Sequence, residues 1–188
     1  MSHAGTALLD PAIIYKKIDL VEGMKVVEFG CGRTGHFLFT ASKVVGDKGI
    51  VYALDILKEV LESIKNRSRF EGYHNILPIW TDIEKVGGAG VPEGSIDAGF
   101  FINVFFQLKN KADAFAEASR LLKNGSSLVI VDWAKKFNEE LGPDQNKMVD
   151  PKELEEIAKK YGFILQENFL PGDYHFCLIF KKEEGTNK

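Results

Sequence analysis

The stretch that decides the fold is residues 26–37, which read VVEFGCGRTGHF. A short apolar run ends in an acid, three glycines follow within six positions, and apolar residues then recur at helical spacing. This order predicts a strand, a tight turn and a helix, the first unit of a parallel α/β sheet. Glycines suit such a turn because they lack a Cβ atom and let a ligand approach the backbone. Open α/β sheets bind ligands at the carboxyl ends of their strands, so we expect a nucleotide-like cofactor here.

Outward from this stretch, segments with strand and helix spacing alternate along the chain. They predict strand units joined by helices, followed by a helix and a β-hairpin with its turn at 171–173. Right-handed crossovers would fold this into an α/β three-layer sandwich, with a Rossmann-like, seven-stranded, mostly parallel sheet and a C-terminal antiparallel hairpin. The predicted strands are 24–29, 50–54, 76–80, 95–104, 127–131, 163–170 and 174–181, and the predicted helices are 8–18, 35–45, 57–70, 111–122 and 151–161.

Length and composition fit one domain. The chain has 188 residues, of which 45% are hydrophobic, so it can bury a substantial core. We expect an N-terminal helical segment at 1–22 that packs on the core and the cofactor site. A single domain should follow at 23–182, and a flexible tail at 183–188.

Charge and cysteine content argue against several classes of protein. The net charge is -3 with acids and bases intermixed, so we expect no nucleic-acid partner. No apolar run is long enough for a bilayer and no signal-peptide pattern begins the chain, so we expect a soluble cytoplasmic protein without a membrane partner. Cys31 and Cys177 have no metal-binding or redox spacing, so we expect reduced thiols and no metal site. The oligomeric state stays open between a monomer and a homodimer.

The glycine loop by itself allows two kinds of cofactor. Residues 30–35 fit G-x-G-x-x-G, and Asp55 lies 20 residues beyond the last glycine, which also matches a dinucleotide-binding fingerprint. Glu28 ends the first strand, however, and Asp82 follows the third, so we expect a cluster of carboxylates at one edge of the sheet. Such a cluster disfavours a pyrophosphate and favours a cationic nucleoside, by roughly a few kcal/mol for a close charge pair. S-adenosylmethionine, with its sulfonium, amino-acid end, ribose and adenine, has this chemistry.

With these motifs the sequence resembles the class I S-adenosylmethionine-dependent methyltransferases. It is most similar to the small single-domain type that includes the ubiquinone/menaquinone C-methyltransferases. The resemblance covers residues 22–181 and is most specific at 24–55 and 112–132. It implies the strand order 3-2-1-4-5-7-6 and S-adenosylmethionine as cofactor. It also implies cofactor contacts from Glu28, Gly30, Cys31, Gly32, Gly35, Asp55, Ile56, Asp82, Ile83 and Asn103.

Several roles follow from this resemblance. Glu28 would reach the methionine ammonium, Asp55 the two ribose hydroxyls, and Asp82 the adenine amino group, while Ile56 would pack on the adenine. One departure concerns Gly35, because residues 33–34 stand before it where most relatives have a single residue. Structural alternatives to these roles remain open. Asp82 or Asp132 could cap a helix or loop, and Asn103 could satisfy backbone groups at the end of its strand. Cys31 could simply fill space in the loop, and His36 or His175 could have a structural role.

The acceptor side of the site is harder to read from the sequence. Methyl transfer is an in-line displacement at an already activated sulfonium methyl, so no catalytic residue type is obligatory and none is assigned. We expect the N-terminal segment and the loops at 103–109 and 133–149 to form the acceptor pocket, and Phe137 lies in the second of these loops. We expect a small, partly apolar acceptor, with a nicotinamide-dependent oxidoreductase or a methyltransferase-like module acting on a macromolecule as alternatives. Candidate substrate contacts are Tyr15, Phe106, Trp133 and His175.

Overall fold

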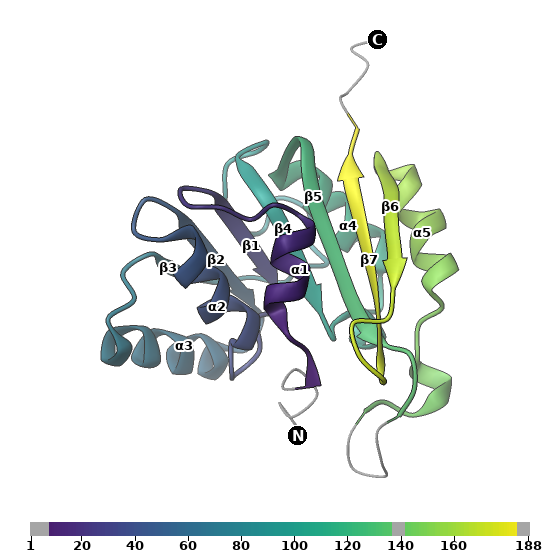
Figure 1. Cartoon of the computed structure of the whole chain (residues 1–188), viewed down its shortest axis with the longest axis horizontal. Coiled ribbons are helices and arrows are strands. Elements are labelled where there is room, and N and C mark those ends of the chain that lie inside the picture. The colour runs from purple at the N-terminus through teal and green to yellow at the C-terminus, as the bar shows by residue number, and fades with distance from the viewer. Residues whose placement is uncertain (1–7, 137–141, 184–188) are drawn as a thin grey trace.

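The structure is a computed structural model that describes residues 8–136 and 142–183. Phe137, most of the expected tail and the first seven residues of the expected N-terminal segment lie outside these ranges. The described chain forms one seven-stranded sheet in the order β3-β2-β1-β4-β5-β7-β6 (Figure 1). The strands are β1 (Lys25–Phe29), β2 (Ile50–Asp55), β3 (Ile76–Trp80), β4 (Ile96–Ile102), β5 (Leu122–Trp133), β6 (Phe163–Phe169) and β7 (His175–Lys182).

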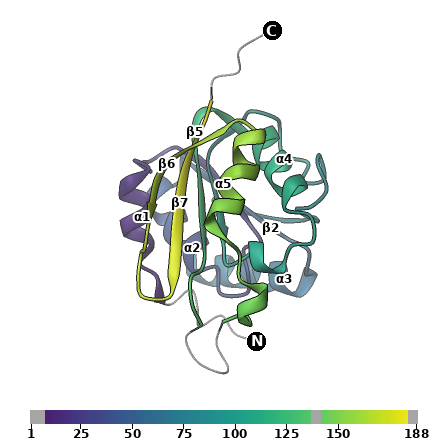
Figure 2. The same ribbon diagram turned by 90° about the vertical axis from the view of Figure 1, so that its right-hand side faces the viewer.

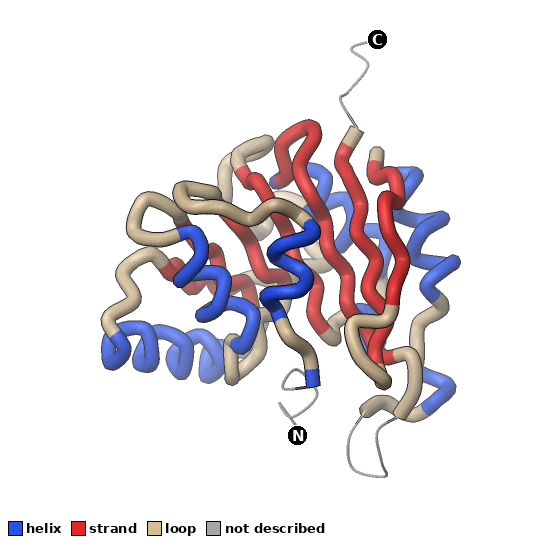
Figure 3. The backbone as a smooth tube through the Cα atoms, viewed as in Figure 1, coloured by secondary structure: helices blue, strands red, loops and turns tan. Residues whose placement is uncertain are grey.

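The strand pairings confirm the predicted sheet. The first five strands pair in parallel, whereas β7 runs antiparallel to both β5 and β6. All five parallel strands therefore end at the same edge, where loops gather at the bottom of Figure 3. The helices are α1 (Pro11–Lys17), α2 (His36–Val45), α3 (Lys58–Glu71), α4 (Lys111–Leu121) and α5 (Pro151–Lys160), with short 3-10 turns η2 (Phe105–Gln107) and η3 (Gln145–Lys147).

Two apolar cores lie on the two faces of the sheet. Residues of α1, α2 and α3 pack on one face, and residues of α4 and α5 pack on the other. Figure 2 shows α1 and α5 on opposite sides of the sheet. The division follows from strand geometry, because successive side chains of a strand point to opposite faces. In β1, Val26 joins the core under α1 to α3, while Val27 and Phe29 join the core under α4 and α5.

Most element boundaries lie within two residues of the predictions, and three of the differences have a clear local description. Helix α1 begins at Pro11 rather than residue 8, because Asp10 caps it by accepting the Ala12 N–H at 3.0 Å. Strand β4 stops at Ile102, since Asn103 has φ 57° and leaves the extended conformation. Strand β5 begins at Leu122, five residues earlier than predicted.

The early start of β5 has a local cause. Leu122 pairs with Ile96 directly after α4, and regular pairing resumes only when Ser127 meets Ala98. The intervening residues form an irregularity that contains Gly125 at φ 74°. Glycine there indicates a turn in the sequence, but it marks a bulge inside the strand. No helix in the described ranges has the length and apolarity that crossing a membrane requires.

Candidate functional site

A cleft of about 640 Å³ lies at the carboxyl edge of the parallel strands. It is lined by the glycine loop, by the residues that follow β2 and β3, and by the ends of β4 and β5. Most of the residues singled out in the sequence meet there: Glu28, Gly30, Cys31, Gly32, Asp55, Ile56, Asp82, Ile83, Asn103, Phe106 and Trp133. The expectation that three acids at strand ends come together is confirmed.

The glycine loop is shaped by hydrogen bonds to the end of β2. Gly30, at φ 72°, and Cys31 both donate their N–H groups to the Leu54 carbonyl, at 2.8 and 3.0 Å. A Cβ on Gly30 would stand 3.0 Å from a Val104 methyl, which is tighter than ordinary contact. The backbone thus runs close to β4 on one side and is open to the cleft on the other. Cys31 is buried in this loop, and burial raises the pKa of its thiol well above the ordinary value.

Gly35 is not in the cleft lining. It is buried at the start of α2 with φ 53°, and a Cβ there would stand 2.8 Å from Ile64 and 3.0 Å from the ring of Phe39. Its place is the packing of the loop on α3. Arg67 of α3 strengthens this packing by donating to the Thr34 carbonyl at 2.8 Å. The departure from the family pattern at residues 33–34 is therefore stabilised by a contact with α3.

Asp55 ties the loop to the start of α3. One carboxylate oxygen accepts the Gly32 N–H at 3.1 Å, and the other accepts the Leu57 N–H at 3.0 Å. The side chain belongs to a residue that is only 8% exposed. The first oxygen also accepts the Cys31 thiol at 3.9 Å. A carboxylate offers about four acceptor positions, so the second oxygen keeps a free position, and a ligand hydroxyl can take the place of the weak thiol donor on the first.

Two oxygen atoms in the cleft are buried and have no hydrogen-bond partner among the described residues: Oε2 of Glu28 and Oδ1 of Asn103. Burial raises the pKa of Glu28 well above its ordinary value, the Leu38 N–H acts in the opposite direction, and the nearby Asp55 raises it further. Buried polar groups usually find partners, and an unpaired one costs about 1–3 kcal/mol. Both oxygens therefore indicate a ligand that donates hydrogen bonds.

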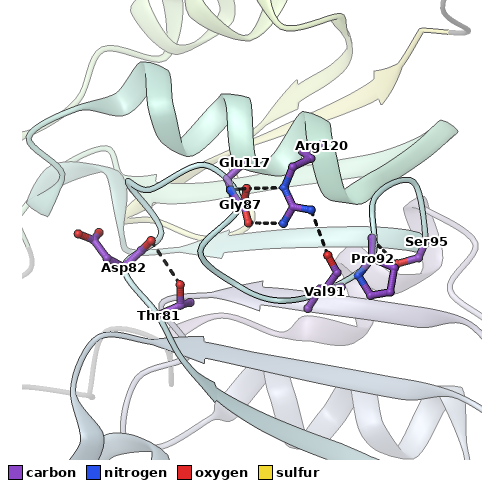
Figure 4. Close-up of polar contacts among 8 residues, drawn as sticks. All are labelled: Thr81, Asp82, Gly87, Val91, Pro92, Ser95, Glu117 and Arg120. Carbon is purple, nitrogen blue, oxygen red and sulfur yellow. Dashed lines mark hydrogen bonds and ion pairs between the residues drawn. The ribbon is translucent and has the colours of Figure 1, made fainter.

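Asp82 begins the segment between β3 and β4. Its carboxylate accepts the Glu84 N–H at 3.0 Å, and Lys85 lies 4.0 Å away. Figure 4 shows how this segment is held on α4: Glu117 accepts the Gly87 N–H and binds the guanidinium of Arg120. The Glu117–Arg120 pair thus anchors to α4 the segment that carries Asp82 and Ile83.

Two of the residues considered for the acceptor lie outside the cleft lining. Tyr15 is buried between Phe37 and Phe100, and its hydroxyl donates to the Phe37 carbonyl at 2.6 Å. His175 is fully buried behind Trp133, with ring centroids 4.3 Å apart. Burial lowers the pKa of His175 to about 4, and neither ring nitrogen has a partner. His175 therefore supports Trp133 in the wall of the cleft from behind, whereas Tyr15 belongs to the core under α1 to α3.

The sequence assigned no ligand contact to several residues that line the cleft, among them Thr34, His36 and Glu84. Gln107, Leu108 and Pro143 also line it, and they lie in the loops at 103–109 and 133–149 that were expected to form the acceptor pocket. Thr34 and His36 lie inside the motif that was already recognised, so their position along the chain was a usable signal. Pro143 reaches the cleft from the loop at 133–149. Together with Phe106 and Trp133, Pro143 and Leu108 make one part of the lining apolar.

Asp132 caps the turn η2, one of the two readings that the sequence left open. Its buried carboxylate accepts the N–H groups of Phe106 at 3.3 Å and Trp133 at 2.8 Å. Burial raises the pKa of Asp132 to about 7, although these N–H groups act in the opposite direction. Asp132 thus fixes the backbone on which two aromatic residues of the lining stand.

The raised pKa of Asp132 predicts a specific pH dependence of stability. Between about pH 4 and 7 the folded protein keeps a proton that the unfolded chain releases, so stability falls as pH rises through this window. The slope is roughly 1.4 kcal/mol per pH unit from this residue. The asparagine of Asp132→Asn cannot titrate. The difference between the free energy of unfolding of this variant and that of the wild type should therefore shift in favour of the variant as pH rises. Urea unfolding of both proteins between pH 4.5 and 7.5 measures this, and parallel profiles would contradict it.

Comparison with known proteins defines the class. The methyltransferase domain family matches residues 20–170, and the chain belongs to this family. It is a class I S-adenosylmethionine-dependent methyltransferase domain, and S-adenosylmethionine is the methyl donor that the family implies. The resemblance stated from the sequence is therefore confirmed. The strand order that it implied is the order observed.

Individual relatives support this assignment. A solved structure of an S-adenosylmethionine-dependent methyltransferase from Aquifex aeolicus is 26% identical, with a TM-score of 0.84 over 96% of this chain and 94% of that one. The ubiquinone/menaquinone biosynthesis C-methyltransferase of Shewanella baltica is 30% identical over 62% of this chain and 45% of that protein. The protein-L-isoaspartate O-methyltransferase of Thermotoga maritima is 32% identical over 50% of this chain and 28% of that protein. The chain spans less than half the length of these curated relatives.

Proposed function

We propose that this protein transfers the methyl group of S-adenosylmethionine to a small, uncharged and partly apolar acceptor by in-line displacement. The observation that carries the proposal is the composition of the cleft. Its lining contains the acids Glu28, Asp55, Asp82 and Glu84 and, among the described residues, no lysine or arginine. A cationic sulfonium nucleoside suits this lining, whereas a pyrophosphate-linked coenzyme would face uncompensated repulsion.

The residues of the chain have separate tasks in this proposal. Asp55 accepts hydrogen bonds from the ribose, Asp82 from the adenine amino group, and Glu28 from the methionine ammonium. Ile56, which is 56% exposed at the cleft, offers an apolar surface for the adenine. The cofactor brings a methyl group that is already activated, so the protein needs to position the acceptor and exclude water. Positioning of this kind can contribute roughly 7–11 kcal/mol to lowering the barrier.

The aromatic part of the lining supports a small acceptor that is partly apolar. Phe106 and Trp133 stand on backbone that Asp132 fixes, so their rings form a stable surface. A carboxylate or phosphate on the acceptor would meet acids without a lysine or arginine to balance it. A neutral ring or chain would gain about 25 cal/mol for each Å² of apolar surface that it buries.

Two measurements test this function. A thermal-shift comparison should show stabilisation by S-adenosylhomocysteine and none by NAD⁺. The protein should then transfer labelled methyl groups from S-adenosylmethionine into the small-molecule fraction of a cell extract. Label in protein or RNA instead would overturn the acceptor class and leave methyl transfer standing. Stabilisation by NAD⁺ alone would overturn the whole proposal.

The buried carboxyl group of Glu28 leads to a prediction about protons. Burial raises the pKa of Glu28 and so favours its protonated form, whereas an ammonium group beside it would favour the carboxylate. Binding of S-adenosylhomocysteine should therefore release more protons from the wild type than from Glu28→Gln. Calorimetry at one pH in two buffers of different ionisation enthalpy counts these protons. Equal counts in the two proteins would contradict a contact between Glu28 and the ammonium.

A further inference from the structure

The cofactor of the proposed function carries a carboxylate as well as its positive charges. In this cleft that carboxylate would lie at the end where Glu28 stands, in a lining that contains four acids and, among the described residues, no lysine or arginine to balance it. Two like charges 4 Å apart repel by about 4 kcal/mol at an effective dielectric constant of 20. The protein therefore needs another donor at the place where the amino-acid end of the cofactor binds.

Among the described residues of the lining, His36 is the one whose side chain can become a cation. It is the first residue of α2, it is half-buried, and it follows the glycine loop directly. Its Nε2 lies 3.1 Å from the carbonyl oxygen of Leu9, which can only accept a hydrogen bond. Nε2 therefore carries a hydrogen, and Nδ1 is the nitrogen left for a ligand. Among the described residues, no hydrogen bond of Nδ1 is found.

Glu28 provides an independent sign of a ligand at the same helix end. Its Oε2 is buried and unpaired, and its carboxyl group also meets the N–H of Leu38, in the first turn of α2. His36 and Glu28 thus stand at one helix terminus, one able to donate and the other to accept. The free N–H groups of a helix N-terminus add a partial positive charge there.

We propose that His36, as an imidazolium with a hydrogen on each ring nitrogen, is the residue that recognises the carboxylate of the cofactor. Its Nδ1–H donates to the carboxylate while its Nε2–H stays bonded to the Leu9 carbonyl. This inference rests on the proposed function and assigns a residue to one end of its cofactor. An α-amino acid carries its ammonium and carboxylate on the same carbon, so Glu28 and His36 together match its two charges. His36 is then a determinant of cofactor specificity, because it distinguishes the complete cofactor from thioether nucleosides without an amino-acid end.

The test compares three ligands by calorimetry. S-adenosylhomocysteine has both charged groups, decarboxylated S-adenosylhomocysteine keeps only the amine, and 5′-methylthioadenosine has neither. The variant His36→Gln keeps an amide donor where Nε2 meets Leu9 and removes the group at Nδ1. It should weaken S-adenosylhomocysteine about 10- to 100-fold, the contribution of a charge-assisted hydrogen bond. The other two ligands should change less than about threefold, because they lack the carboxylate that the bond needs.

Two further variants complete the comparison. Glu28→Gln should weaken the two ligands that carry the amine and spare 5′-methylthioadenosine. His74→Gln makes the same chemical change at an exposed histidine outside the cleft lining, and it should alter none of the three affinities. Binding of 5′-methylthioadenosine also reports that each variant is folded.

The possible outcomes separate this inference from the proposed function. Equal weakening of all three ligands by His36→Gln would mean that His36 holds the loop in place, and the inference would be overturned. Unchanged binding of S-adenosylhomocysteine by His36→Gln would overturn it as well. If the wild type bound none of the three ligands, the proposed function itself would fail.

Discussion

Asp55→Ala should abolish detectable binding of S-adenosylhomocysteine. In the proposed function Asp55 accepts hydrogen bonds from two ribose hydroxyls, and hydrogen bonds to a charged group contribute about 1.5–3 kcal/mol each. Losing both corresponds to a loss in affinity of roughly 10²- to 10⁴-fold. The same loss is expected for 5′-methylthioadenosine, because it keeps the ribose. Thermal shift and calorimetry with both ligands measure the effect.

Asp55 also holds the local backbone, so this experiment needs a control. Its oxygens also accept the N–H groups of Gly32 and Leu57, so the alanine variant loses some local order. Asp55→Asn keeps one acceptor oxygen and nearly the same shape, and should still lose most of the affinity. Asp173→Asn, in the exposed turn of the hairpin, is the matched neutral change. An affinity in Asp55→Asn equal to that of the wild type would remove Asp55 from the cofactor site.

The residues of the site that the sequence predicted are marked by local sequence patterns. Glu28 and Asp55 each stand at the end of an apolar strand, and parallel strands end at one edge, so local signals sufficed to bring them together. The glycines of the loop were predictable for the same reason. The fold class followed because the helices and strands alternate clearly along the chain, whereas the strand order was implied by the family resemblance.

The residues that the sequence misplaced depend on packing between distant segments. Tyr15 packs against Phe37 and Phe100 in the core under α1 to α3, and His175 is buried behind Trp133, which lines the cleft. Side-chain direction at the end of an element decides such cases, and composition does not report it. Gly35 was misplaced for a related reason, because its missing side chain makes room for α3 and not for a ligand.

The segment between β3 and β4 contains several glycines, and one buried carboxylate helps to hold it on α4. Glu117 of α4 is 1% exposed, and burial alone would raise its pKa. Arg120 and the N–H of Gly87 outweigh burial, so the pKa of Glu117 is lowered and the carboxylate stays charged. Arg120 in turn donates to the Val91 carbonyl at 3.1 Å (Figure 4). Helix α4 thereby holds two points of the segment that begins with Asp82.

Glu117→Ala should therefore destabilise the protein and loosen part of the cofactor site. Removing one partner of a buried ion pair costs about 3–5 kcal/mol, and we expect about 2–4 kcal/mol here because Arg120 is partly exposed. Urea unfolding at pH 7 measures this loss. Replacing the pair together, Glu117→Leu with Arg120→Met, leaves no unpaired charge and should recover most of the stability, although not the bond to Gly87. A single variant as stable as the wild type would show that the segment is held by other contacts, and Asp82 would then not depend on α4.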